Sequence, residues 1–120
     1  MTYGLLEYEQ LKFLREYNFK VLNFSNGKYT EICLITDKLC ITYHEWPQFN
    51  DFNIIITKTL EDRKNHSYQA VYGDKWFMEN VLPKYKQCKN STKCSRIDLV
   101  SFYLHDQLEN HRKIFDISIG

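Results

Sequence analysis

The sequence predicts a small α+β domain with two layers: an antiparallel meander of four to five strands, and N- and C-terminal helices packed on one face of it. Residues 19–60 contain four strand-like segments separated by short turns, and segments with helical periodicity lie on both sides of them. Short connections between strands favour antiparallel neighbours. A length of 120 residues suits a single domain, residues 1–120, with one hydrophobic core.

Apolar residues recur at helical spacing near the N-terminus. Charged side chains such as Glu7 and Arg15 fill the opposite side, which is typical of an amphipathic helix. Asn18 is the expected end, because asparagine tolerates the left-handed conformation found at helix C-termini. The apolar positions are Leu5, Leu6, Tyr8, Leu11, Phe13, Leu14 and Tyr17.

The first two strands are expected at Phe19–Ser25 and Lys28–Thr36. They flank Asn26-Gly27, a dipeptide that favours a two-residue type I′ hairpin because both residues accept positive φ. The second strand is apolar on both faces, which indicates a strand inside the sheet that is covered on both sides.

The third strand, Leu39–His44, alternates between an apolar and a mixed face. Pro47 ends it, because proline cannot donate a hydrogen bond to a neighbouring strand. In the fourth strand Phe52, Ile54 and Ile56 point to one side.

The segments that follow have weaker signals. Glu61–Asn65 is expected to be a charged loop, and Ser67–Tyr72 is a candidate fifth strand. Lys75–Leu82 is a candidate short helix, capped by Asp74 and ended before Pro83.

The last helix has the clearest start. Ser95-x-x-Asp98 matches a capping box that precedes an apolar run. The helix is expected over residues 96–115, and its apolar stripe is Ile97, Val100, Leu104, Leu108 and Phe115.

Charge and hydropathy argue against several classes of function. The formal net charge is +1, so no overall field attracts nucleic acid or a membrane surface. No apolar run approaches the ~20 residues of a membrane span, and the N-terminus lacks the features of a signal peptide. We therefore expect a cytoplasmic protein with reduced cysteines and no membrane partner.

One set of residue types suits zinc, namely Cys88, Cys94, His105 and His111. The gap between the cysteines is longer than in zinc fingers. The two histidines lie six residues apart, so on a helix their rings would diverge by about 120°. We expect no metal site and no cofactor.

No pattern for catalysis is present in the chain. Cys40 and His44 fall on one face of a strand but about 13 Å apart, too far for a nucleophile and its base. The chain contains no nucleophile elbow, phosphate loop or metalloprotease motif. Glu45 and Asp51 are better explained as solvated turn residues than as paired carboxylates. The sequence therefore predicts a protein that is not an enzyme.

The end of the third strand is the best candidate for a partner-binding surface. Aromatic residues beside acidic ones at a strand end are typical anchors of protein interfaces. The alternative is that Trp46 folds over the edge of the core. The predicted contacts are Glu45, Trp46, Phe49 and Asp51.

A basic segment provides the alternative function. Five of the 16 basic residues lie between Pro83 and Arg96, a stretch without acidic residues. Such a run can contact phosphates, although a solvated loop explains it better and no nucleic-acid-binding motif accompanies it. The residues are Lys84, Lys86, Lys89, Lys93 and Arg96.

The layout resembles small immunity proteins of bacterial polymorphic and contact-dependent toxin systems. The features that carry this resemblance are a helix ending in Phe13-Leu14-Arg15-Glu16-Tyr17-Asn18-Phe19, an aromatic-rich meander and a closing helix at 96–115. The meander contains Tyr29, Ile41-x-Tyr43-x-x-Trp46 and Phe52-x-Ile54-x-Ile56. The resemblance implies a cytosolic protein that binds a cognate toxin domain and neutralises it. It implies no catalytic residues. Inhibitors of basic nuclease toxins are often acidic, and this chain departs from that pattern.

Overall fold

The computed structural model describes residues 8–49, 51–84, 96–110, 113–115 and 117–118. These residues form two compact units, 1–74 and 75–120, and each unit is described by itself. The α+β class and the antiparallel meander are confirmed. A single domain with both helices on one face of the sheet stays a prediction.

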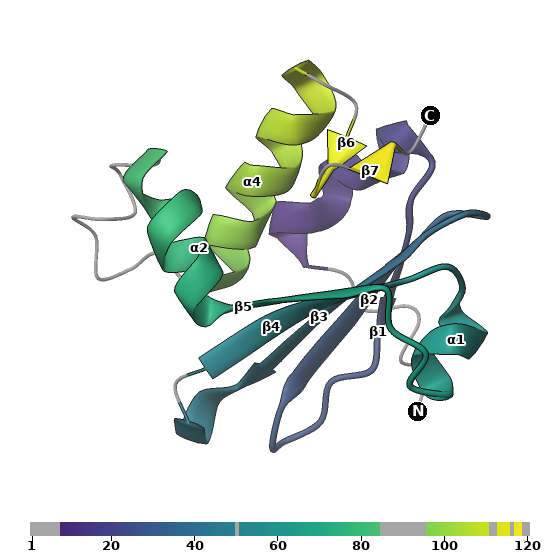
Figure 1. Ribbon diagram of the computed structural model, residues 1–120, viewed down its shortest axis with the longest axis horizontal. Coiled ribbons are helices and arrows are strands. Elements are labelled where there is room, and N and C mark those ends of the chain that lie inside the picture. The colour runs from purple at the N-terminus through teal and green to yellow at the C-terminus, as the bar shows by residue number, and fades with distance from the viewer. Residues whose placement is uncertain (1–7, 50, 85–95, 111–112, 116, 119–120) are drawn as a thin grey trace. The chain divides into compact units, whose positions relative to one another are not determined.

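The first unit is built on a five-stranded antiparallel sheet with the strands in chain order (Figure 1). All four predicted strands are present, and β3 rather than β2 lies at the centre. The strands are β1 (Lys20–Asn23), β2 (Thr30–Ile35), β3 (Cys40–Trp46), β4 (Asp51–Thr57) and β5 (Ala70–Gly73).

Strand alternation gives the sheet two different faces. The face that carries Tyr43, called the Tyr43 face, is an apolar core, and side chains from the first four strands are buried there. The opposite face carries Thr42 and is contacted by the short helix α1 (Leu60–Lys64), so it is called the α1 face. The buried residues of the Tyr43 face are Val21, Asn23, Ile32, Leu34, Ile41, Tyr43, Phe52, Ile54 and Ile56.

The N-terminal helix ends where the sequence predicts but has a tighter geometry. It is the 3-10 helix η2 (Glu9–Tyr17), which begins with the Leu11 N–H donating to the Tyr8 carbonyl, three residues back. Asn18 is left-handed, with φ 66°, and ends the helix. The expected helix and its end at Asn18 are therefore confirmed, with 3-10 rather than α-helical hydrogen bonding.

The predicted type I′ turn at Asn26-Gly27 is wrong, although the hairpin itself exists. Neither residue has a positive φ. Instead, the Asn26 side-chain oxygen accepts hydrogen bonds from the backbone N–H groups of Lys28 and Tyr29, at 2.7 and 3.1 Å. The turn is therefore closed by hydrogen bonds to the asparagine side chain and not by a backbone with positive φ.

The expected charged loop at Glu61–Asn65 is mostly helix. Thr59 caps α1, because its hydroxyl oxygen accepts from the Asp62 N–H at 3.0 Å. Acidic residues fill the first turn and basic residues the last, which suits the helix dipole. The fifth strand begins at Ala70, three residues later than predicted, because the Ser67 N–H donates to the Asp62 carbonyl and keeps that segment at the end of α1.

The second unit contains α2 (Asp74–Asn80), the 3-10 turn η4 (Leu82–Lys84), α4 (Arg96–Asn110) and a two-stranded hairpin, β6 (Lys113–Ile114) and β7 (Ile117–Ser118). Asp74 lies within the first turn of α2 rather than capping it. The predicted cap Ser95 lies outside the described residues. Four aromatic rings, from Trp76, Phe77, Tyr103 and Phe115, contact one another in this unit.

The closing helix ends at Asn110, so the prediction that it reaches Phe115 is wrong. Phe115 has φ 50°, in the left-handed region that a helix cannot contain, and it follows β6. Its backbone N–H donates to the Tyr103 hydroxyl oxygen at 3.0 Å, and its ring stacks on Tyr103 with centroids 4.7 Å apart. Phe115 is therefore buried by a turn.

Removing the Tyr103 hydroxyl is expected to destabilise this turn. In Tyr103→Phe the Phe115 N–H loses its acceptor while the aromatic stack remains, so the free energy of unfolding should fall by about 1 kcal/mol. Urea denaturation measures this change. Tyr68→Phe, at a residue that is 40% exposed, is the control and should change stability by less than about 0.5 kcal/mol. Equal effects of the two substitutions would contradict the structural role of the Tyr103 hydroxyl.

Candidate functional site

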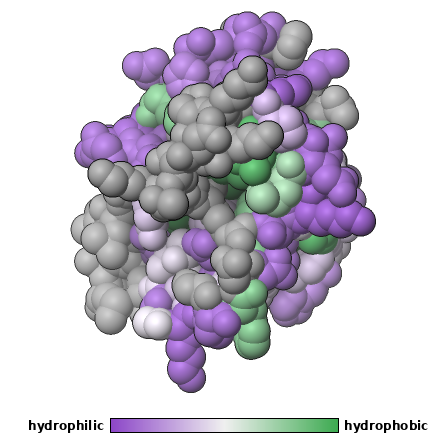
Figure 2. All heavy atoms as spheres, turned by 90° about the vertical axis from the view of Figure 1, so that its left-hand side faces the viewer, coloured by the Kyte–Doolittle hydropathy of each residue, from purple (hydrophilic) through white to green (hydrophobic). Residues whose placement is uncertain are grey.

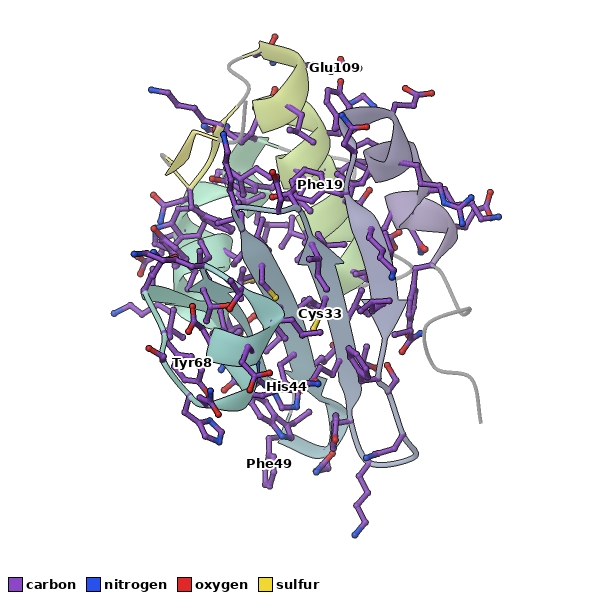
Figure 3. All side chains as sticks on the ribbon, turned by 90° about the vertical axis from the view of Figure 1, so that its right-hand side faces the viewer. Phe19, Cys33, His44, Phe49, Tyr68 and Glu109 are labelled. Carbon is purple, nitrogen blue, oxygen red and sulfur yellow. The ribbon has the colours of Figure 1, made fainter. Side chains whose placement is uncertain are left out.

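The predicted contact residues lie around the turn between β3 and β4. This turn is the 3-10 segment η3 (Pro47–Phe49). Phe49 is 72% exposed, and in Figure 3 its side chain extends away from the end of the sheet, beyond His44. On the face shown in Figure 2, in contrast, hydrophilic residues dominate the described surface and hydrophobic ones form small separate areas.

Strand register divides the predicted residues between the two faces of the sheet. Trp46 and Asp51 are directly opposite each other on β3 and β4, and both belong to the α1 face. Glu45 belongs to the Tyr43 face, where its carboxylate accepts a hydrogen bond from the Tyr43 hydroxyl at 2.8 Å. Glu45 and Asp51 are therefore not paired carboxylates, and the predicted surface continues on the α1 face without Glu45.

Trp46 is half-buried. This agrees partly with the prediction of an interface anchor and partly with the alternative that Trp46 folds over the edge of the core. Its indole lies against the His44 ring, with centroids 3.9 Å apart and planes inclined by 35°. Tyr29 meets the same imidazole edge-on at 4.9 Å. His44 is thus the middle ring of an aromatic stack, defined here as Tyr29, His44 and Trp46, at one end of the α1 face.

A row of polar side chains crosses the sheet beside this stack. Glu31, His44 and Asn53 are register partners on β2, β3 and β4, so they lie side by side on the α1 face and are called the polar row. Arg63 of α1 donates to the Glu31 carboxylate at 3.0 Å and also lies over the Tyr68 ring, 5.7 Å from its centroid. The ion pair links α1 to β2.

Several atoms of this cluster are buried without a hydrogen-bond partner among the described residues: His44 Nε2, Asn53 Oδ1 and Arg63 Nε. The His44 Nδ1 atom lies 4.0 Å from the Glu31 carboxylate, which is beyond hydrogen-bond distance. Burial first, and then the positive charge of Arg63, lower the pKa of His44 from 6.5 to about 4. His44 is therefore neutral at physiological pH.

Two cysteines lie beside Thr42 on the same face. Cys33 and Cys40 are free and fully buried, as small apolar side chains would be, and their sulfur atoms lie 3.5 and 3.9 Å from the Thr42 hydroxyl. A hydrogen bond with Cys33 lowers the pKa of Cys40 to about 7, and the same bond with burial raises the pKa of Cys33. Thr42 lies between Cys40 and His44 on this face, so those two do not form a catalytic pair.

The remaining candidate residues fall largely outside the described ranges. These are Lys86, Lys89 and Lys93 of the basic segment, and Cys88, Cys94 and His111 of the zinc-like set. Lys84 is exposed at the end of η4, and Arg96 begins α4. Among the described residues, no group of three or more His, Cys, Asp or Glu side chains is placed to hold a metal ion.

The sequence did not reveal the polar row or its partner in α1. Glu31 and Arg63 are 32 residues apart, and Arg63 falls in the segment expected to be a loop. The signal that could have found them is the placement of polar residues in strands whose neighbours are apolar. Asn53, between Phe52 and Ile54, shows this pattern.

Comparison with protein-family models, with curated proteins and with solved structures found no match. In the part of the chain that the structure describes, none of the helices has the length and apolar character needed to cross a membrane.

The buried state of His44 predicts a pH-dependent stability. The folded pKa of about 4 lies below the unfolded value of 6.5, so the unfolded chain takes up the proton first. The contribution is complete above about pH 6.5 and is lost as pH falls toward 4, by about 3 kcal/mol. In His44→Phe, which keeps an aromatic ring under Trp46, the decline over this range should be smaller by that amount. Parallel pH profiles for the two proteins would contradict this.

The ion pair between Arg63 and Glu31 is expected to contribute more than an exposed one. Both side chains are mostly buried, at 12% and 19% exposed, whereas the Lys12–Glu9 pair is 54% and 82% exposed. Arg63→Met leaves Glu31 uncompensated and should cost about 3 kcal/mol. Lys12→Met should cost less than about 0.5 kcal/mol. Equal losses in thermal or urea denaturation would show that Arg63 does not hold α1 on the sheet.

Proposed function

We propose that this chain is a protein-binding module, most specifically a cytoplasmic immunity protein that binds a cognate bacterial toxin domain and neutralises it. The proposal assigns it no catalytic residue and no cofactor. Its binding surface is the β3–β4 turn, including Trp46, Phe49 and Asp51, with Glu45 on the opposite face of the same hairpin.

One observation carries the proposal. Phe49 is a large hydrophobic side chain that is 72% exposed, the most exposed of the large hydrophobic residues that the structure describes. It projects from a turn between two seven-residue strands, so its position is supported by the sheet. Leaving a phenylalanine in water gives up the hydrophobic stabilisation of burial, about 1.5–3 kcal/mol, which a partner can restore.

The neighbours of Phe49 suit the anchor of an interface. Trp46 is half-buried and held against His44, so its ring loses little conformational freedom when a partner covers it. A preorganised aromatic residue beside an exposed one is the arrangement expected of an interface hot spot. The resemblance of the sequence layout to small immunity proteins supports a bacterial toxin domain as the class of partner.

Truncating Phe49 should abolish capture of the partner without unfolding the protein. Tagged chain expressed in its native host should retain one stoichiometric protein, and Phe49→Ala should weaken this complex by about 30-fold or more because a hot-spot side chain is lost. Met78→Ala, which truncates a residue that is 46% exposed in the second unit, is the matched control. Titration calorimetry with the purified partner measures the difference.

Neutralisation is tested by growth. The polypeptide encoded beside this gene should stop growth when expressed alone, and co-expression of the wild-type chain or Met78→Ala should restore it, whereas Phe49→Ala should not. Capture of no partner, or full protection by Phe49→Ala, would refute the proposed function.

A further inference from the structure

Trp46 and Asp51 face each other across the β3–β4 pair at the exposed end of the α1 face. Directly opposite residues of antiparallel strands have Cβ atoms about 5 Å apart, so the two side chains leave the sheet from neighbouring positions on the same face. Asp51 is exposed, and one of its oxygens accepts from the Phe52 N–H at 2.8 Å. This bond orients the carboxylate and leaves its second oxygen available, because an ionised carboxylate has about four acceptor sites.

The stack beneath Trp46 has no positive charge of its own. One face of the indole rests on the His44 ring, and Tyr29 closes the other end of that imidazole. His44 is neutral above about pH 5, so it places no positive charge against the indole of Trp46. Arg63, the nearby cation of α1, is engaged by Glu31 and Tyr68.

We propose that Trp46 and Asp51 form a receptor for an arginine side chain on the surface of the protein partner. The guanidinium group stacks on the solvent side of the indole and donates hydrogen bonds to the Asp51 carboxylate, while the exposed Phe49 ring covers its aliphatic stem. This inference rests on the proposed function and specifies the chemistry that the partner must present at this point.

Arginine fits this site better than the other donors. Its planar guanidinium can stack on an aromatic ring and donate to a carboxylate at the same time, whereas a lysine ammonium is a strongly hydrated point charge. Trp is the best of the aromatic residues for holding a cation. Glu45, the other carboxylate of the turn, lies on the opposite face and binds Tyr43, so the site presents a single carboxylate.

The test is a titration of the full-length, 15N-labelled chain with N-acetyl-arginine methylamide, followed through the tryptophan indole N–H signals in NMR spectra. The Trp46 signal should move, and the signal of Trp76, in the second unit, is the internal reference. The neutral isostere N-acetyl-citrulline methylamide should leave both signals unchanged, and N-acetyl-lysine methylamide should bind more weakly.

Two matched variants complete the test. Asp51→Asn should weaken binding of the arginine probe about fivefold, because an exposed charged pair is worth up to about 1 kcal/mol. Asp37→Asn, which neutralises an exposed carboxylate in the turn between β2 and β3, should bind the probe as the wild type does. Equal shifts with the citrulline or lysine probe, or unchanged affinity in Asp51→Asn, would overturn the arginine receptor.

The two proposals fail in different ways. If the chain captures no partner but the Trp46 signal responds to arginine through Asp51, the proposed function is wrong and the receptor stands. If capture depends on Phe49 but neither Asp51→Asn nor the arginine probe affects it, the receptor is wrong and the proposed function stands.

Discussion

β3 is hydrogen-bonded to a strand on each side, and its register against both neighbours determines the rest of the first unit. Side chains alternate between the faces of a strand, so a shift of one residue would exchange the buried ring of Tyr43 for Thr42 and move His44 into the core. The observed register buries an apolar layer on the Tyr43 face and leaves the polar row on the α1 face. It also places Trp46 opposite Asp51.

The α1 face contributes less to the stability of the fold than a fully apolar face would. Buried polar atoms without a hydrogen-bond partner cost about 1–3 kcal/mol each, and His44, Asn53 and Arg63 contribute such atoms in the part of the chain described. The apolar layer on the opposite face offsets these costs, and the ion pair of Arg63 with Glu31 attaches α1 over part of the row. Buried polar atoms without a hydrogen-bond partner occur most often at functional sites, so the α1 face is a candidate functional surface.

The strands of the fold could be predicted from the sequence because their two-residue periodicity is local information. The turn at Asn26 could not be predicted in detail, since an asparagine side chain and a left-handed backbone are alternative ways to close it. The helix α1 could not be predicted, because five residues without an apolar stripe give no helical pattern, and the cap on Thr59 is the informative feature. Phe115 continued the apolar spacing of α4 but is buried by a turn, and spacing alone cannot separate these cases.

Only the position of the candidate site along the chain could be predicted from the sequence. Closeness in sequence grouped Glu45 with Trp46 and Asp51, but strand alternation assigns Glu45 to the other face, where Tyr43 occupies it. The same alternation places Trp46 over His44, whose neutral state depends on burial and on a cation from α1. In the proposed receptor, the exposed phenylalanine, the supported indole and the carboxylate of Asp51 would select a partner group by shape and charge together. The register of the sheet therefore determines which of these neighbouring side chains share a face, and Glu45 is excluded from that set for this reason.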